Sequence, residues 1–518
     1  MNDHEIIEGV IHEFAGLAKH PRPSHHEKGV SDYIVSRLHE LGVADVTQDE
    51  VYNVIANVPA SKGCEDWPLT VLQGHMDMVC VAKPGVDFDP LTSEIKLVRE
   101  GNILHADGTS LGADDGIAVA LALYLIQQDI QHGPLRLIFT VDEETGMTGA
   151  THLDPKYVQD VQYIINCDSE YMDVLCVGSA GSVHTHFSRP IHWQAAEGKQ
   201  AFTITAKDFA GGHSGETIND GKSNAIKALS LALRRIAQAG VSYVLASITG
   251  GVAANAIPSE ASAVIVVDDV NAGETVKKAV GEEQAEIAEV YGEVEKNAHF
   301  LVESADVPAQ TFSADDTKNL VSLLNILHCG VFAMNQLLPK LPDLSANIGT
   351  IRTEGDHVAI QYFPRASADA RLRELMAILP VYAELTGCDI ELASPEPAWT
   401  ENPHSKLVPL VADVYKEEAG KEARIEAMHG GLETGYFFSM NPKLDIISVG
   451  PTTHDIHSAD ESVELDTVAL LTRIVAKTLG KLNNEWLVDS DSWLVGACMW
   501  QARSWIYVIS QSGVMGVI

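Results

Sequence analysis

The chain has 518 residues, of which 46% are hydrophobic and 21% are charged. This length is enough for two hydrophobic cores, and the composition is that of a globular protein rather than a disordered or fibrous one. Acidic residues outnumber basic residues by 72 to 35, so the surface should repel phosphate backbones, and nucleic-acid binding is not expected. The acidic excess is interpreted as a solvated surface; the alternative is that some carboxylates cluster to bind cations.

The first 185 residues alternate between helical and strand patterns. Apolar residues recur at helical spacing in residues 5–17 and 29–41, and the alanine-rich segment 117–126 is typical of a buried helix. Short apolar runs bounded by turn residues indicate buried strands at residues 54–58, 69–72, 135–141 and 163–166. This alternation predicts an α/β fold with a mostly parallel sheet and helices on its faces.

Residues 186–398 show a different pattern, with half-exposed strands at 201–207 and 261–267 and amphipathic helices at 223–237 and 274–291. They predict a separate α+β domain of antiparallel strands with helices on one face. The α/β pattern then returns, with a strand at 444–449 and helices at 404–419 and 466–482, the second capped by Asp466. We therefore expect a discontinuous domain, residues 1–185 and 399–487, with the domain 186–398 inserted into it.

The end of the chain differs from the rest. Trp493, Trp500 and Trp505 crowd a stretch without clear capping or periodicity. We interpret residues 488–518 as an atypical, non-native tail, the alternative being a genuine C-terminal strand or helix.

Cysteine usage and the N-terminal residues indicate the compartment. The seven cysteines are irregularly spaced and form no CxxC pair, which favours reduced thiols and a cytoplasmic location. The first residues are acidic where a signal peptide would be basic, and no run of about eighteen apolar residues occurs, so no membrane span is expected.

Polar residues with metal-binding chemistry follow several of the predicted strands. The runs end in Gly74-His75-Met76-Asp77, in Asp142-Glu143-Glu144 and in Cys167-Asp168, and the last strand leads to His454 and His457. The carboxyl ends of parallel strands meet at the edge where open α/β sheets place their sites. Taken singly, each has an ordinary explanation, such as a hydrogen-bonded histidine or a solvated glutamate pair. Together they supply the mixed nitrogen and oxygen ligands that zinc accepts.

Asp114 belongs to a fifth group, Leu111–Gly116, which stands directly before the predicted buried helix. Its ordinary explanation is a helix N-cap, the commonest role of an aspartate at such a position. Its place beside the other strand-end residues makes it a candidate metal ligand as well.

These motifs resemble those of the M20 metallopeptidases, in particular their aminoacyl-histidine dipeptidase branch. Eight signatures occur in family order between about residues 20 and 461: Pro21-Arg-Pro-Ser24, Gly74–Asp77, Ala106–Gly116, Asp142–Gly146, Gly211–Gly215, Gly251 to Pro258, His429–Glu433 and His457–Glu461. The resemblance implies a catalytic zinc-binding domain at 1–185 and 399–487 and a lid and dimerisation domain at 186–398.

The resemblance also implies two Zn²⁺ ions per subunit, for which Co²⁺ or Mn²⁺ are possible substitutes. The implied ligands are His75 and Asp168 on one metal, Glu144 and His457 on the other, and Asp114 between them. Asp77 is implied to hold the His75 ring without touching a metal. A cis peptide is expected between Asp114 and its neighbour Asp115.

Glu143 is implied to act as the general base for a metal-activated water that attacks the peptide carbonyl. In the inserted domain, His213 is implied to stabilise the oxyanion, and Asn255 and Arg365 to grip the substrate carboxylate. Gly431 is implied to lie in a loop against the substrate. The role of His429 stays open between substrate contact and capping of that loop.

The resemblance predicts a metallo-dipeptidase that hydrolyses unblocked dipeptides, with Xaa-His substrates such as carnosine (β-alanyl-histidine) favoured, acting as a homodimer. One alternative is an M20 amidohydrolase acting on N-acyl amino acids, or a carboxypeptidase; substrates with and without a free α-amine would separate these activities. A non-enzymatic alternative is an acidic cation-binding protein, for which disrupted ligands are expected, and the sequence has none missing.

Overall fold

The computed structural model describes residues 2–197 and 200–483, and the predicted tail at 488–518 lies outside them. The described chain divides into two compact units. The first contains residues up to Gly178, Glu401–Ala427 and 436–483, and the second contains Ser179–Thr400 and Met428–Gly435.

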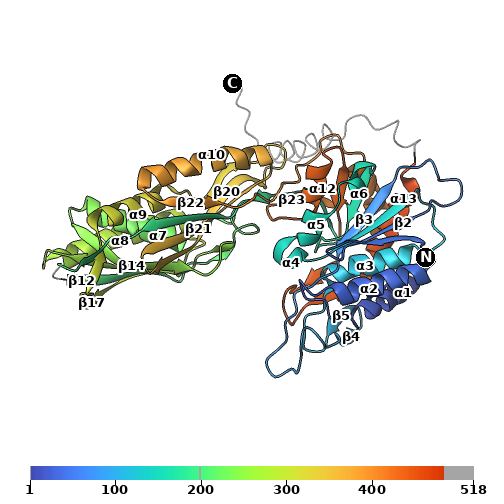
Figure 1. Ribbon diagram of the computed structural model, residues 1–518, viewed down its shortest axis with the longest axis horizontal. Coiled ribbons are helices and arrows are strands. Elements are labelled where there is room, and N and C mark those ends of the chain that lie inside the picture. Colours follow the sequence, from blue (N-terminus) through green and yellow to red (C-terminus); the bar gives the residue numbers. More distant parts are fainter. Residues whose placement is uncertain (1, 198–199, 484–518) are drawn as a thin grey trace, which may run out of the picture. The chain divides into compact units, whose positions relative to one another are not determined.

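The first unit is built on an eight-stranded sheet (Figure 1). Its strand order is β1 (Asp45–Gln48), β2 (Val54–Val58), β6 (Leu135–Thr140), β3 (Thr70–His75), β7 (Tyr163–Asn166), β24 (Asp445–Ser448), β8 (Val174–Ser179) and β23 (Arg424–Met428). The four central strands β6, β3, β7 and β24 run parallel, whereas β1, β2 and β8 join antiparallel. The predicted α/β fold is thus confirmed, with antiparallel additions beside the parallel centre.

Helices pack around this sheet. The long ones are α1 (Asp3–Leu17), α2 (Lys28–Glu40), α3 (Ala113–Leu125), α11 (Leu407–Ala419) and α13 (Leu465–Lys481). Helix α3 is buried along almost its whole length because it packs between β3, α1 and α13. Shorter helices are α4 (Glu143–Gly146), α5 (Thr148–His152), α6 (Lys156–Gln159) and α12 (Thr434–Met440). In a small second sheet, the strand order is β25 (Thr453–His454), β26 (Ser462–Glu464), β5 (Ile103–Ala106) and β4 (Leu97–Glu100).

One expected helix cap is wrong. The N-cap of α13 is Glu464, and Asp466 lies inside the first turn of the helix. The Asp466 carboxylate instead accepts hydrogen bonds from the Asn102 amide and the Thr467 N–H. The helix therefore begins before the position where the aspartate pattern predicted it to begin.

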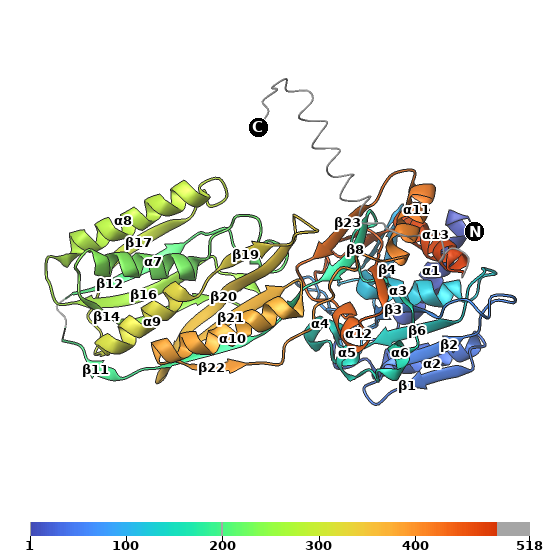
Figure 2. The same ribbon diagram turned by 90° about the horizontal axis from the view of Figure 1, so that it is seen from above.

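The second unit is an antiparallel sheet with helices on one face (Figure 2). The main strand order is β17 (His299–Ala305), β12 (Gln200–Lys207), β16 (Ala261–Val267), β14 (Tyr243–Gly251), β20 (Pro342–Glu354), β21 (His357–Ala366), β10 (Thr185–Pro190) and β22 (Asp389–Leu392). Strands β19 (Gly330–Met334) and β9 (Gly181–Ser182) pair beside it, and two short ribbons pair β11 (Trp193–Ala195) with β18 (Gln310–Phe312) and β13 (Gly212–His213) with β15 (Ala256–Ile257). The predicted α+β character is confirmed.

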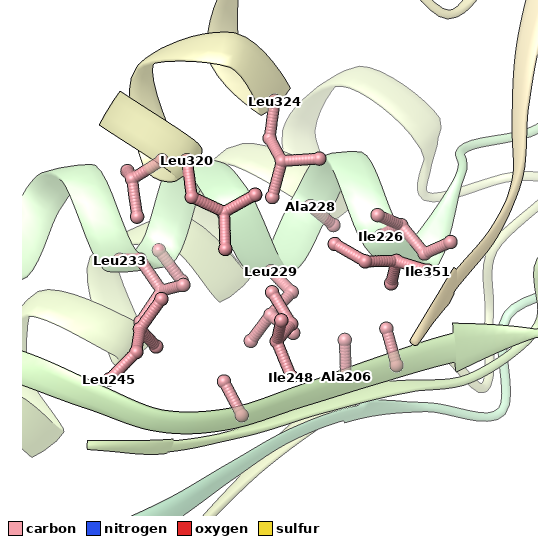
Figure 3. Close-up of a cluster of buried hydrophobic side chains, with 14 of the residues drawn as sticks. Ala206, Ile226, Ala228, Leu229, Leu233, Leu245, Ile248, Leu320, Leu324 and Ile351 are labelled. Atoms are coloured by element: carbon pink, nitrogen blue, oxygen red, sulfur yellow. The ribbon is translucent and has the colours of Figure 1, made fainter. Parts of the chain in front are cut away.

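The core of this second unit lies between the sheet and its helices, which are α7 (Ala225–Gln238), α8 (Ala272–Tyr291), α9 (Ala314–Ile326) and α10 (Asp369–Thr386). Figure 3 shows Leu229 and Leu233 of α7 pointing toward Leu245 and Ile248 of β14. The Asn224 side chain caps the start of α7 by accepting the Lys227 N–H at 3.0 Å. Among the described residues, no helix combines the length and hydropathy needed to cross a membrane.

Candidate metal centre

Four of the predicted ligands follow the carboxyl ends of the central parallel strands. His75 is the last residue of β3, Glu144 follows β6, Asp168 stands two residues after β7, and His457 lies in the segment after β24. Because parallel strands end at one edge of a sheet, these side chains converge there. The sheet therefore gathers residues that are up to about 380 positions apart in the chain.

The fifth predicted ligand, Asp114, comes from an irregular helix start. Gly112 is the N-cap of α3 in the left-handed region (φ 72°), and Asp114 and Asp115 have non-helical backbone angles. The peptide bond between these two aspartates is cis, as expected. Asp114 is thus not the N-cap, and its carboxylate lies among the strand-end residues instead.

Asp114 lies between two imidazoles. One of its carboxylate oxygens is 3.2 Å from His75 Nε2, and the other is 3.2 Å from His457 Nε2. Glu144 Oε2 is 2.9 Å from the same His457 nitrogen, and Asp168 Oδ1 is 3.8 Å from His75 Nε2. The five predicted ligands are therefore brought together as one carboxylate flanked by two histidine–carboxylate pairs.

The nitrogen and oxygen atoms of this cluster are suitable ligands for divalent cations. Ligand atoms of His75, Asp114 and Glu144 lie within 4.8 Å of one another, and so do those of His75, Asp115 and Asp168. Glu144 Oε1 is buried and has no hydrogen-bond partner among the described residues, although a buried oxygen normally has one. Imidazole nitrogens combined with carboxylate oxygens form the donor set that zinc accepts.

The electrostatics of the cluster also favour added positive charge. Hydrogen bonds to Asp114 and Glu144 raise the pKa of His457 to about 10. Burial alone would lower the pKa of His75, but its contacts with Asp114 and Asp77 raise it well above its usual range. Burial also raises the pKa of Asp168 well above the ordinary aspartate value. Each shift favours a bound proton in this cluster, a positive charge that a bound cation would supply instead.

Asp77 connects two parts of the site. Its Oδ1 atom is 3.3 Å from His75 Nδ1 and accepts the Glu143 N–H at 3.1 Å. Its Oδ2 atom accepts the Glu144 N–H at 3.2 Å and the Ser24 hydroxyl at 2.8 Å. The fully buried Asp77 therefore holds the turn that carries both glutamates, a function that the sequence did not reveal, and its carboxylate also lies beside the His75 ring.

The turn that carries Glu143 has further support from buried polar groups. Asp142 adopts a left-handed conformation (φ 56°), and its N–H donates to Glu27 Oε1 at 2.9 Å. Its carboxylate accepts the hydroxyls of Thr145 and Thr148. Burial raises the pKa of Glu27 to about 7. Sequence reasoning assigned no role to Glu27 or to Asp142, although Asp142 opens the quoted Asp142–Gly146 motif.

The two histidines that follow β24 have different surroundings. His457 meets Asp114 and Glu144, whereas His454 Nε2 lies 2.8 Å from Glu464 Oε1. This difference agrees with the preference for His457 as the candidate ligand.

The predicted substrate residues all belong to the second unit. Arg365, on β21, is buried, and its guanidinium carbon lies 4.7 Å from the centroid of the Phe363 ring. Burial lowers the pKa of Arg365 to about 10. Its Nε has no hydrogen-bond partner among the described residues. Burial and the nearby Arg365 charge lower the pKa of His213, which pairs with Ala256 in the β13–β15 ribbon beside Asn255. A buried guanidinium with an unused donor suits a carboxylate.

Gly431 lies two residues after His429, which is buried. The Nε2 atom of His429 is 2.7 Å from the Ser345 hydroxyl oxygen, and its Nδ1 has no hydrogen-bond partner among the described residues. Burial, followed by the Arg365 charge, lowers the pKa of His429 to about 3. The adjacent Gly430 carbonyl accepts the Ala180 N–H at 2.8 Å, which fixes the loop. His429 is therefore neutral and anchored inside this unit.

Comparisons with known proteins agree with these features. The chain is 32% identical over 478 residues to the cytosol non-specific dipeptidase of Escherichia coli, covering 90% of this chain and 97% of the relative. The crystal structure of aminoacylhistidine dipeptidase from Vibrio alginolyticus superposes with a TM-score of 0.84 at 31% identity, covering 91% and 96% of the two chains.

A more distant structure shares the fold. The aminopeptidase PepT from Bacillus cereus has a TM-score of 0.54 at 16% identity, over 92% of this chain and 98% of the PepT chain. The model of peptidase family M20/M25/M40 matches residues 71–481. This match covers most of the chain and every candidate metal ligand, so the predicted relationship is confirmed and the chain belongs to peptidase family M20/M25/M40.

Proposed function

We propose that this M20 peptidase is a dipeptidase that binds two divalent cations, zinc in the first instance, and hydrolyses unblocked dipeptides. The observation that carries the proposal is the Asp114 carboxylate, which lies 3.2 Å from each of two imidazoles that have carboxylate neighbours of their own. His75, Asp114 and Asp168 would hold one cation, and Asp114, Glu144 and His457 the other. When bound, the two cations would supply Lewis acidity that acidifies a water and polarises the scissile carbonyl.

Glu143 is the group proposed to move the proton. Its backbone is fixed by the hydrogen bond to Asp77, and its charge contributes to the raised pKa of Asp168, so its carboxylate acts on the same site. As general base, Glu143 would take a proton from the attacking water and return it to the nitrogen of the leaving amine. Asp77 would keep the His75 ring and the glutamate turn in register during both transfers.

The second unit is proposed to bind the substrate. Arg365 has a buried, unused N–H and would pair with the C-terminal carboxylate together with Asn255. His213, whose lowered pKa keeps it neutral, would donate a hydrogen bond to the oxyanion. The loop at Gly431 would lie along the substrate backbone. We propose that this unit, residues 186–398 in the predicted boundaries, is the lid and dimerisation domain of a homodimer.

A preference for Xaa-His dipeptides such as carnosine is proposed from the name of the Vibrio alginolyticus relative. The Escherichia coli relative is named a cytosol non-specific dipeptidase, which supports a broader dipeptide range and a cytoplasmic location. The ratio of kcat/KM for Ala-His and β-alanyl-histidine to that for Ala-Ala and Gly-Gly separates the two ranges. A ratio near one would favour the non-specific activity.

The test combines metal analysis with a substrate panel. The purified protein is expected to contain two cations per chain, to lose activity on dialysis against a chelator and to recover it with Zn²⁺, with Co²⁺ and Mn²⁺ as comparisons. Unblocked dipeptides should be hydrolysed, and N-acetylated dipeptides and N-acyl amino acids should not. Cleavage of N-acyl amino acids alone would establish the amidohydrolase alternative, and a protein with no turnover would be the cation-binding alternative.

A further inference from the structure

The irregular start of α3 presents four backbone N–H groups to one buried carboxylate. Glu461 Oε2 accepts the N–H groups of Leu111 at 2.7 Å and Gly112 at 2.9 Å. Glu461 Oε1 accepts the N–H groups of Ala113 at 2.8 Å and Asp114 at 3.4 Å. Helix starts leave such donors without intrahelical partners, and Gly112 has no side chain to cap them. Glu461 therefore fixes the backbone from which the Asp114 carboxylate projects.

A buried arginine holds the same loop to the end of β3. Arg22 Nη1 donates to the carbonyls of Met76 at 2.9 Å and Asp77 at 3.0 Å, while Nη2 donates to the Gly112 carbonyl at 2.5 Å. The guanidinium packs tightly against Gly116: a Cβ atom added at this glycine would lie only 2.6 Å from Nη2, closer than van der Waals contact allows. The segment that carries His75 and the segment that carries Asp114 are thus joined by one planar, charged side chain.

We propose that Arg22 and Glu461 are positioning residues that preorganise the metal pair by holding Asp114 between the two histidines. Arg22 joins the β3 end to the loop, and Glu461, four residues after His457, joins the loop to the segment of the second histidine. Both act through backbone groups rather than through the candidate ligands themselves. The inference rests on the proposed two-cation site, and it predicts that these residues determine cation affinity.

The experiment measures Zn²⁺ affinity of the metal-free full-length protein by competition with a chromophoric chelator. In Glu461→Gln, the amide would direct its NH₂ group at backbone N–H donors, so two hydrogen bonds are lost. In Arg22→Lys, the charge remains, but a single ammonium cannot reach carbonyls on two segments in the same fork. Zn²⁺ affinity is expected to fall about 10- to 100-fold in each variant, as is usual when outer groups of a metal site are lost.

Two exposed charged side chains provide matched controls. Asp460 is adjacent to Glu461 in the chain and forms an exposed ion pair with Lys83, so Asp460→Asn removes a negative charge from the same segment. Arg99 forms an exposed ion pair with Glu8, so Arg99→Lys makes the same change of side chain as Arg22→Lys at an exposed position. Both controls should keep wild-type Zn²⁺ affinity. Affinities of Glu461→Gln and Arg22→Lys equal to those of the controls would overturn the inference.

A purely structural role is distinguished by two further readouts. If Arg22 and Glu461 had only a structural role, their substitution would lower the unfolding midpoint of the metal-free protein without weakening Zn²⁺ binding by the folded fraction. That result would count against the proposal. The Co²⁺-loaded variants should also show visible absorption bands shifted from the wild type, because the ligand geometry changes. If Glu461→Gln does not fold, the milder Arg22→Lys decides. A wild-type protein that binds no Zn²⁺ would instead refute the proposed function.

Discussion

Glu143 and Glu144 are adjacent, yet they are assigned different roles, so isosteric substitutions of the two provide a sharp test. Both backbone N–H groups donate to Asp77, and a glutamine at either position keeps that hydrogen bond. In Glu143→Gln, the turn and the candidate ligands are unchanged, but the proton acceptor is gone. We expect two bound cations and a kcat lowered about 10²- to 10⁴-fold, the usual contribution of a general base. This loss corresponds to about 3–5 kcal/mol of barrier.

Glu144→Gln is the matched counterpart. Glu144 Oε2 lies 2.9 Å from His457 Nε2, and its other oxygen is buried without a hydrogen-bond partner among the described residues. The amide removes a negative charge from a candidate ligand, so we expect the loss of one cation per chain. Metal content by plasma mass spectrometry and kcat for Ala-His hydrolysis are measured on both variants. Near-normal turnover of Glu143→Gln, or loss of metal from it while Glu144→Gln keeps both ions, would refute the assignment.

Three further predictions concern the second unit. Arg365→Met should raise KM for dipeptides about 30-fold, since loss of a buried charge partner costs about 2 kcal/mol or more, with metal content unchanged. His213→Ala should lower kcat and keep both cations; a metal-depleted variant would place this histidine among the ligands instead. His429 has a pKa of about 3 when folded against about 6.5 when unfolded, so below pH 6.5 the unfolded chain takes up a proton that the folded chain does not. Stability should therefore fall by about 2 kcal/mol between pH 7 and pH 5 on this account. Urea unfolding should show a smaller fall in His429→Gln, and an equal fall would contradict the assigned pKa.

The parts of the fold that sequence reasoning predicted best are the buried strands. The predicted strands at 54–58 and 163–166 coincide with β2 and β7, because a buried strand has a short, mostly apolar pattern that ends where the chain leaves the sheet. The same boundaries located the candidate ligands, since polar residues directly after such strands lie at one edge. The resemblance to the family then divided roles between neighbours such as Glu143 and Glu144, which spacing alone leaves equivalent.

The residues that sequence reasoning missed act on backbone groups far away in the chain. Glu461 accepts N–H groups from residues up to 350 positions earlier, and Arg22 reaches a carbonyl 90 positions later. No periodicity encodes such contacts, because they depend on how separate segments meet at the sheet edge. Local polarity likewise misplaced the cap of α13: Asp466 lies inside the first turn, after the Glu464 N-cap, and its carboxylate accepts the Asn102 amide as well as the Thr467 N–H.

Hydrogen bonding sorts the carboxylates of the site into two kinds. Asp77 and Glu461 accept several N–H or hydroxyl groups, which offset the cost of burying their charge. Glu144, a candidate ligand, keeps a buried oxygen without a hydrogen-bond partner among the described residues. Unpaired buried charge is costly, so a folded protein retains it where a cation would meet it. On this reasoning Asp77 and Glu461, which satisfy backbone groups, build the site, and the unpartnered oxygen of Glu144 marks where a metal ion would bind.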